Sequence, residues 1–317
     1  MTISEIIAER PQTEFSLEVL PPLKGKGTTS LFKTIDRLMN FQPRYINITT
    51  HRSEYVYKEL ADGTFRRDSI LRRPGTIAVA SAISRRYDVE VVPHVVCSGF
   101  TRQEIEYMLL DLQFLDIHHL LLLRGDKAKD DARFVPTKGG HSHTTELIEQ
   151  VNRFNEGYFL DGSNVDRVGE PFSFGVACYP EKHEEAPNLD FDLDVLRRKQ
   201  ELGADYAITQ MFFDNKKYFS FVDEARRRGI TIPIIPGIKP IAKLNQLNVV
   251  PKTFHLDLPT ELSTEMQRCK SDEDVKRVGV EWGIEQCKEL IREGVPCIHF
   301  YTLGATDSIC EIAKEIY

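Results

Sequence analysis

The chain has 317 residues, 41% of them hydrophobic, which is enough for one α/β barrel with extended loops or for two smaller domains. Its 41 basic and 48 acidic side chains give a formal net charge of −7, which argues against general nucleic-acid binding. Six cysteines show neither C-x-x-C pairs nor zinc-ligand spacing, and no apolar run is long enough to cross a bilayer. We therefore expect a cytoplasmic protein with free thiols, no metal and no membrane partner.

Short apolar runs alternate with longer amphipathic segments along the whole chain. The apolar runs predict eight strands, near residues 14–20, 45–49, 90–96, 119–123, 173–178, 205–211, 232–236 and 297–301. The amphipathic segments predict helices near residues 29–40, 75–86, 102–115, 144–155, 191–202, 216–228, 241–248, 272–293 and 306–316. Because each strand is followed by a helix, the pattern predicts an α/β fold, a (β/α)8 TIM barrel forming a single domain over residues 1–317.

Four segments interrupt this alternation and are predicted to lack regular structure. Residues 51–73 and 127–143 lengthen the loops after the second and fourth strands, and residues 156–171 form a polar loop before the fifth strand. Residues 251–270 are predicted to be an irregular link before a long helix. In barrel enzymes the loops after strand C-termini carry the active site, so we expect the first two insertions at the functional face.

The fourth predicted strand ends in an abrupt change of polarity. Four leucines, residues 120–123, are followed by Arg124, Gly125 and Asp126. The leucines are typical of a parallel strand buried on both faces. At its C-terminal end, glycine allows a ligand to approach the backbone, and arginine can bind a phosphate through two hydrogen bonds.

The first predicted strand contains a carboxylate among apolar residues. It reads Phe-Ser-Leu-Glu-Val from Phe15, which places Glu18 opposite the apolar face of the strand. Burying a carboxylate is costly unless it is paired or used, and burial raises its pKa. We therefore predict that Glu18 is a proton donor near neutral pH.

The remaining strand ends bring hydroxyls, imidazoles, an amide and aromatic rings to the same face. No spacing indicates a Ser–His–Asp or Cys–His nucleophile, and the histidine pairs of the chain lack metal-ligand spacing. Flat apolar walls with few polar groups suit a planar heterocycle, and a neighbouring phosphate anchor suits a flavin nucleotide. The residues alone thus predict a barrel that holds a phosphorylated aromatic cofactor and protonates a substrate through Glu18.

Eight blocks of the sequence resemble the catalytic domain of the methylenetetrahydrofolate reductase family. They occur in the family's order from residue 15 to about residue 303. The blocks are Phe-Ser-Leu-Glu-Val-Leu-Pro-Pro, Pro-His, Leu-Arg-Gly-Asp, Tyr-Pro-Glu-x-His, Leu-Arg-Arg-Lys, Ile-Thr-Gln-x-Phe-Phe-Asp, Ile-Ile-Pro-Gly-Ile and His-Phe-Tyr-Thr.

The resemblance implies a barrel that binds FAD, with NADH or NADPH as electron donor and 5,10-methylenetetrahydrofolate as substrate. By position, Glu18 is similar to the acid that opens the folate imidazolidine ring, and Asp126 to the acid near the flavin ring. These two residues are the expected catalytic groups. Gln210 and Gln246 are similar to substrate-binding residues, together with Glu18. The positions similar to flavin contacts are Thr49, His94, Leu123, Arg124, Gly125, Asp126, His143, Thr144, Tyr179, His183, Asp192 and Lys199.

The chain departs from the family after its His-Phe-Tyr-Thr-Leu block, where relatives continue with Asn-Arg. Here the residues are Gly304 and Ala305, so the arginine that helps to hold folate is absent. Arg66, Arg67 or Lys243 could supply the cation for the glutamate tail. The resemblance also implies the bacterial form, a homo-oligomer of catalytic domains without the regulatory extension of eukaryotic relatives.

Two other functions remain open on the sequence. One is a flavin-free relative that passes hydride directly from NADH to folate. The presence of Arg124, Asp126 and Lys199 favours the flavin-dependent enzyme instead. The other is a non-catalytic barrel that carries folate or flavin. The presence of Glu18 and Gln210 favours an enzyme instead.

Overall fold

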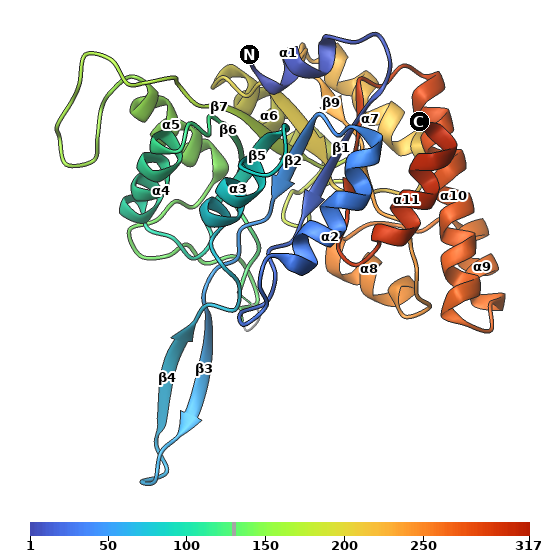
Figure 1. Ribbon diagram of the computed structural model, residues 1–317, viewed down its shortest axis with the longest axis horizontal. Helices are drawn as coiled ribbons and strands as arrows, with labels where there is room; N and C mark the ends of the chain where they lie inside the picture. Colours follow the sequence, from blue (N-terminus) through green and yellow to red (C-terminus); the bar gives the residue numbers. More distant parts are fainter. Residues whose placement is uncertain (129–130) are drawn as a thin grey trace. The chain divides into compact units, whose positions relative to one another are not determined.

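The computed structural model describes residues 1–128 and 131–317. It contains a nine-stranded sheet in the order β10-β11-β1-β2-β5-β6-β7-β8-β9 and a separate two-stranded sheet, β3-β4 (Figure 1). The nine strands are β1 Glu14–Val19, β2 Tyr45–Ile48, β5 Glu90–Val96, β6 His119–Leu123, β7 Ser173–Cys178, β8 Tyr206–Thr209, β9 Ile234–Ile235, β10 Gly237–Ile238 and β11 Cys297–Tyr301. The pairings β1–β11, β10–β11, β5–β6, β7–β8 and β8–β9 are all parallel, and the predicted α/β barrel class is confirmed.

Helices follow the strands as the sequence pattern predicts. They are α1 Ile3–Ala8, α2 Thr29–Leu38 with the 3-10 turn η1 Met39–Phe41, α3 Thr76–Ser84, α4 Arg102–Phe114, α5 Thr144–Asn155, α6 Leu189–Glu201, α7 Asn215–Arg227, α8 Gln246–Phe254, α9 Thr260–Arg268, α10 Asp272–Arg292 and α11 Thr306–Ile316. Side-chain caps begin several of them, because a side-chain oxygen satisfies a free N–H of the first turn. Thr101 and Asn188 cap α4 and α6 in this way.

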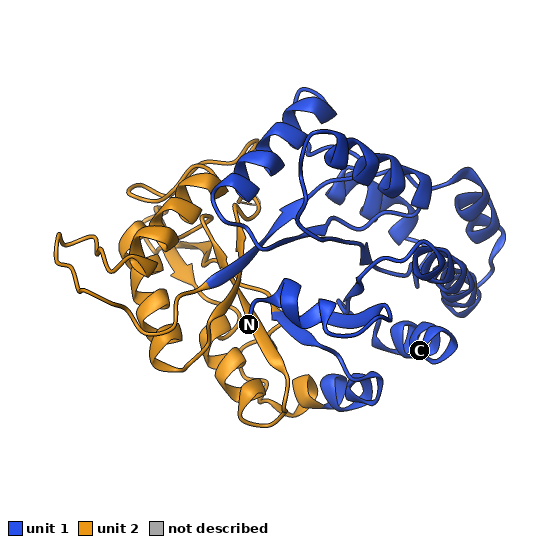
Figure 2. Ribbon diagram, turned by 90° about the horizontal axis from the view of Figure 1, so that it is seen from above, with its two compact units in different colours: residues 1–19, 33–47, 173–317 blue, residues 20–32, 48–172 orange. Residues whose placement is uncertain are grey.

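The chain divides into two compact units, which Figure 2 colours separately. Unit 1 comprises residues 1–19, 33–47 and 173–317, and unit 2 comprises residues 20–32 and 48–172. We propose that both belong to the single domain predicted for residues 1–317, because neither unit is a continuous stretch of chain.

The seventh predicted strand is broken in the structure. Within the predicted range 232–236 only β9 is a strand, and a second short strand, β10, follows directly after Pro236. Proline has no N–H and cannot donate to a ladder, so the strand cannot run straight through this position. As a result β9 pairs with β8, whereas β10 pairs with β11.

Three other predictions are corrected. Residues 51–73 are not a plain loop but contain the antiparallel hairpin β3 (Glu54–Glu59) and β4 (Phe65–Ile70). The link 251–270 contains the whole of α9, whose Leu262 and Met266 are buried one turn apart. The helix predicted at 241–248 begins later, at Gln246, and α1 was not predicted.

The strands of unit 1 enclose a polar layer. Ser16 Oγ lies 2.9 Å from His299 Nδ1, and β1 and β11 pair these two residues directly. The Tyr45 ring stacks on the His299 ring at 6.0 Å. The Tyr206 ring occupies the space above Gly175, where an added Cβ would lie 2.3 Å from it. This fully buried layer lies two residues before Glu18 along β1, so it forms the floor under that carboxyl.

Candidate functional site

The predicted site residues fall in both units, and Glu18 is the central one in unit 1. It lies near the C-terminal end of β1, opposite Tyr301 of β11, and only 8% of it is exposed. Burial raises the pKa of Glu18 to about 8, although the positive charge of Lys239 opposes the rise. A carboxyl with this pKa is largely protonated at neutral pH and can act as an acid.

Lys239, which directly follows β10, is the charged residue that sequence reasoning did not single out. It is 7% exposed, and its Nζ donates a hydrogen bond of 3.2 Å to the backbone oxygen of Leu303. Burial lowers the pKa of Lys239 to about 8, and the charge of Glu18 opposes the fall. Each group thus opposes the effect of burial on the other, so Glu18 and Lys239 form an electrostatically interacting pair. The sequence does show Lys239 at the end of an apolar strand. It does not show that Glu18 of another strand is the partner of this lysine.

Backbone contacts fix the position of Glu18. Thr302 donates two hydrogen bonds to its backbone oxygen, from Oγ1 at 2.6 Å and from N at 3.2 Å. The Tyr301 hydroxyl donates to the backbone oxygen of Thr209 at 2.6 Å, and the Thr209 hydroxyl accepts from Gly237 N at 2.9 Å. A Cβ at Gly237 would lie 2.4 Å from the Thr209 oxygen, so only glycine allows this close approach.

A second group of predicted residues in unit 1 follows β7 and continues into α6. Lys199 is buried, and its Nζ donates to the backbone oxygen of Ala177 at 2.9 Å. Asp192 accepts a 2.5 Å hydrogen bond from His183 N. The rings of Tyr179 and His183 meet edge to face, with centroids 4.7 Å apart. The structure therefore brings these four predicted flavin-contacting residues onto two adjoining elements.

The two predicted substrate-binding amides of unit 1 differ in how their side chains are used. Gln210 follows β8, is half-buried, and its Oε1 accepts from Met211 N at 2.9 Å. Its amide nitrogen remains a potential donor to a ligand. Gln246 Oε1 accepts from Ala242 N and Lys243 N, at 2.7 and 3.0 Å, and so holds the turn that begins α8. The role of Gln246 toward a substrate stays a prediction.

Unit 2 contains the Arg-Gly-Asp segment, Arg124 to Asp126, at the end of β6. Gly125 has a φ of +79°, and a Cβ there would lie 2.9 Å from Ser98 Cβ, so the position requires glycine. The Ser98 hydroxyl donates to the backbone oxygen of Asp126 at 2.6 Å, and Ser98 N donates to the backbone oxygen of Arg124 at 2.9 Å. The Arg124 guanidinium lies over the ring of Phe134 at 4.6 Å. Asp126 itself is exposed, so its carboxylate is available to a ligand.

His94 is the buried imidazole of unit 2. It is 4% exposed within β5, and burial lowers its pKa to about 3, with a further contribution from His51. His94 is therefore neutral at physiological pH. Its backbone oxygen accepts a 2.5 Å hydrogen bond from Thr50 Oγ1, and Thr49 Oγ1 lies 3.2 Å from His51 Nε2. Thr50, which follows β2, is thus bonded to the backbone of β5, whereas Thr49 contacts His51 within its own loop.

The other predicted residues of unit 2 surround the same strand ends. Leu123 closes β6, where its backbone oxygen accepts from Cys97 N at 3.1 Å. His143 is exposed immediately before α5, and its backbone oxygen accepts a 3.7 Å hydrogen bond from Cys97 Sγ. Thr144 is buried as the first residue of that helix. A helix N-terminus favours negatively charged groups, which agrees with a cofactor-contacting position here.

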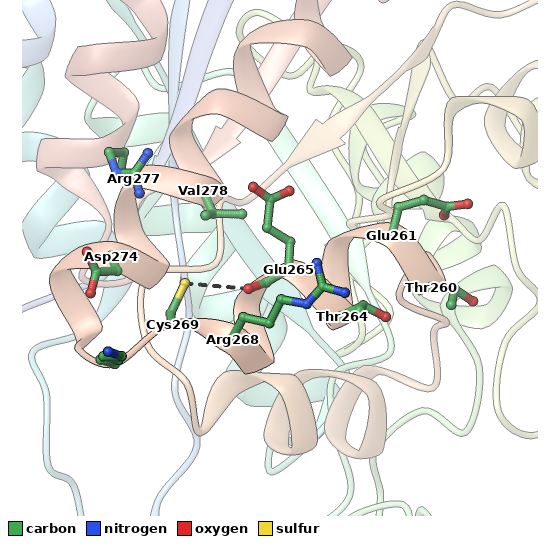
Figure 3. Close-up of a pocket in the computed structure, with 10 residues that line it drawn as sticks. Thr260, Glu261, Thr264, Glu265, Arg268, Cys269, Asp274, Arg277 and Val278 are labelled. Carbon is green, nitrogen blue, oxygen red and sulfur yellow. Dashed lines mark hydrogen bonds between the residues drawn. The ribbon is translucent and has the colours of Figure 1, made fainter.

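A groove of about 750 Å³ lies on the outer surface of unit 1 (Figure 3). It lies along α9 and the first turns of α10, and charged side chains of both signs line it. None of the predicted site residues contributes to it. Among residues 1–128 and 131–317, no group of three or more histidine, cysteine or acidic side chains could hold a metal. In the same ranges, no helix has the length and hydropathy of a membrane span.

The family model of methylenetetrahydrofolate reductase matches residues 2–317. The chain belongs to the methylenetetrahydrofolate reductase family. It is 29% identical to the 5,10-methylenetetrahydrofolate reductase of Salmonella typhimurium over 307 residues, covering 96% of this chain and 91% of that protein. It is 28% identical to methylenetetrahydrofolate reductase (NADH) 1 of Arabidopsis thaliana over 320 residues, covering 98% of this chain. It spans only about half of that plant relative, 49% of its length.

A solved structure also resembles the chain, with a TM-score of 0.61 at 13% identity, and covers 98% of this chain and 97% of the other. That protein, from Clostridium thermocellum, is described as binding two copies of 5-methyl-5,6,7,8-tetrahydrofolic acid. The likeness supports the fold. Within the methylenetetrahydrofolate reductase family, relatives are named for NADH and for NADPH. Ala305, at the position of the family's arginine, is 4% exposed, so the side chain at this position offers no cation to a ligand.

Proposed function

We propose that this chain reduces 5,10-methylenetetrahydrofolate to 5-methyltetrahydrofolate with NADH or NADPH as electron donor and FAD as bound cofactor. The observation that carries the proposal is Glu18, a buried carboxyl with a raised pKa in the first barrel strand of a chain that matches the reductase family throughout. A cytoplasmic location and a homo-oligomeric assembly are part of the proposal.

The described residues fit a flavin nucleotide. Gly125, where an added Cβ would lie 2.9 Å from Ser98 Cβ, forms the close-packed turn that follows Arg124. The forked guanidinium of Arg124 suits a phosphate group. Lys199 adds a buried ammonium in unit 1. When bound, FAD would take hydride from the nicotinamide donor and supply it to the folate.

Glu18 is the proposed general acid. Because burial keeps its carboxyl protonated near neutral pH, it can donate a proton to a nitrogen of the imidazolidine ring and so help to open that ring to an iminium cation. The two hydrogen bonds from Thr302 hold the backbone at Glu18 and so limit the movement of the acid. Lys239 can then return the proton or compensate the carboxylate charge.

Asp126 and Gln210 have supporting roles in the proposal. The exposed carboxylate of Asp126 supplies a fixed negative charge, which stabilises a cationic intermediate and disfavours an anionic one. Gln210 offers its amide N–H group to the pterin, because its oxygen is occupied by Met211 N.

The test is anaerobic mixing of the purified protein with NADH, followed by methylenetetrahydrofolate. We expect the visible flavin absorbance to bleach in the first step and to recover in the second. Bleaching without recovery would indicate a different hydride acceptor. A protein that shows no flavin absorbance even after addition of FAD, yet oxidises NADH when folate is added, would be a flavin-free reductase. A protein that binds folate or flavin without either reaction would be a carrier.

A further inference from the structure

The hairpin β3–β4 of unit 2 has two faces of different chemistry. Three large aromatic side chains lie on one face, and the exposed fractions of Tyr55, Tyr57 and Phe65 are 49%, 61% and 64%. The opposite face carries ion pairs, between Lys58 and Asp68 at 3.0 Å and between Arg66 and Asp68 at 2.9 Å. In Figure 1 the hairpin extends away from the helices of its own unit.

The strand edges of this hairpin are unpaired. In the part of the chain that the structure describes, β3 and β4 form a sheet of two strands only. A two-stranded ribbon is marginally stable in water, and an open edge with aromatic neighbours invites pairing with another strand. The hairpin therefore has the features of an interaction element.

The backbone pattern tells which groups are available at the β3 edge. Leu60 N donates to Thr64 O at 2.7 Å, so residues 54, 56 and 58 bond to β4 in the same alternation. The N–H and C=O groups of Tyr55 and Tyr57 then point to the open side. Any strand that pairs with β3 must bond to these two tyrosines.

We propose that β3 pairs in antiparallel fashion with β3 of a second copy of this chain, about a two-fold axis at Val56. In this register Tyr55 of one copy faces Tyr57 of the other, and their backbones exchange hydrogen bonds. Glu54 of one copy then faces Lys58 of the other, so opposite charges meet on both sides of the axis. Cross-strand pairs of aromatic residues and of opposite charges both stabilise a sheet, and two-fold symmetry repeats each pair.

Charge also argues against the alternative edge. Residues 65, 67 and 69 face outward on β4, so its antiparallel self-pairing would place the axis at Arg67 or at Asp68. Either register sets two like charges directly opposite each other, which is destabilising. The β3 edge is therefore the one suited to a second copy.

Sedimentation equilibrium of the full chain over a wide concentration range tests the proposal. We expect a dimer in the wild type and a dissociation constant weaker by about tenfold or more in Tyr57→Pro, because proline removes an outward N–H twice per dimer. The matched control is Arg67→Pro, which removes an outward N–H of β4 and should leave the dimer intact. Far-UV circular dichroism and thermal unfolding check that both variants fold.

A second variant tests the register. Residues facing each other across the axis at Val56 form a pair without hydrogen bonds, in which the Cα atoms lie about 4.5 Å apart, within disulfide range. We expect Val56→Cys to give a covalent dimer under mild oxidation, whereas Ser69→Cys on β4 remains uncrosslinked. A wild-type monomer at every concentration, an unchanged dimer in Tyr57→Pro, or no crosslink in Val56→Cys would overturn the proposal. These outcomes do not depend on reductase activity.

Discussion

The two ends of strand β1 each carry a buried glutamate, and the two differ in their partners. Glu14, at the start, is 3% exposed and lies 3.7 Å from Arg10 and 3.9 Å from Arg44. Glu18, near the end, has Lys239 as its cationic neighbour. Burial raises the pKa of both carboxyls, and the positive neighbours oppose the rise.

The difference lies in what the partner can do with a proton. Arginine keeps its charge at every accessible pH, so Glu14 faces permanent cations and its cluster serves stability. Burial makes a lysine easier to deprotonate, and it lowers the pKa of Lys239 to about 8, close to the pKa of Glu18. One strand therefore holds a structural carboxyl at one end and an exchangeable proton at the other.

The largest effect is expected from Glu18→Gln. The amide keeps the shape of the side chain but cannot donate an acidic proton, so folate reduction should fall by about 10²–10⁴-fold. Flavin reduction by NADH should stay close to the wild-type rate, since that half-reaction needs no acid at this position. Stopped-flow measurement of the two half-reactions separates them. Equal loss in both would mean that Glu18 holds the cofactor site together instead.

Arg44→Met tests the structural end of the strand. It leaves Glu14 buried with Arg10 alone, and it removes a 2.9 Å hydrogen bond from Arg44 to the backbone oxygen of Ile6. We expect the free energy of unfolding to fall by about 1–3 kcal/mol, because a buried charge loses a partner. Urea unfolding measures the change. Arg10→Met is the control, with a smaller expected loss because the Arg10 side chain is 41% exposed.

Lys239→Met tests the exchangeable end. Without the cation that opposes the effect of burial, the pKa of Glu18 should rise further. The acid then stays protonated to higher pH, and the alkaline limb of the folate half-reaction should move up by about one pH unit. The pH profile of kcat/KM measures this shift. An unmoved limb, in a variant that folds normally, would contradict coupling between the two groups.

Glu14→Gln should have the smallest effect and a defined pH dependence. The folded pKa of Glu14 is raised above 4.5, so the folded state binds more protons than the unfolded state between these values. Its contribution to stability is full below pH 4.5 and is lost as the pH rises through the folded pKa. The glutamine variant does not titrate at this position, so its free energy of unfolding relative to wild type should improve as the pH rises from 4 to 7. Urea midpoints at several pH values give the slope, and the opposite slope would refute the assignment.

Much of the fold could be predicted because its signals are local. The leucine run of β6 and the alternating apolar segments gave seven strands close to their observed positions. The hairpin β3–β4 was missed because the charges of one face hide its alternation of aromatic residues. Helix α9 was not predicted because only Leu262 and Met266 mark its buried face. Helix α8 was predicted too short because Pro251 lies within it, and proline usually ends a helix.

The residues of the candidate site also differ in how clearly the sequence alone reveals them. Glu18 stands out in the sequence because a charge within an apolar strand needs a reason, and burial provides it. Lys239 carries an equally strong signal only once β10 is seen to pair with β11, next to β1. A residue whose importance comes from a partner on a distant strand cannot be recognised from its own surroundings in the chain.

Pro236 has a consequence for the chemistry of Glu18. By ending β9 and letting β10 join β11, this uncharged residue sets the path that carries Lys239 toward β1. The acid strength of a carboxyl in the first strand thus depends on a kink in the seventh. Protein engineers could retune the proton affinity of the site by reshaping this bend, without altering any ionisable side chain.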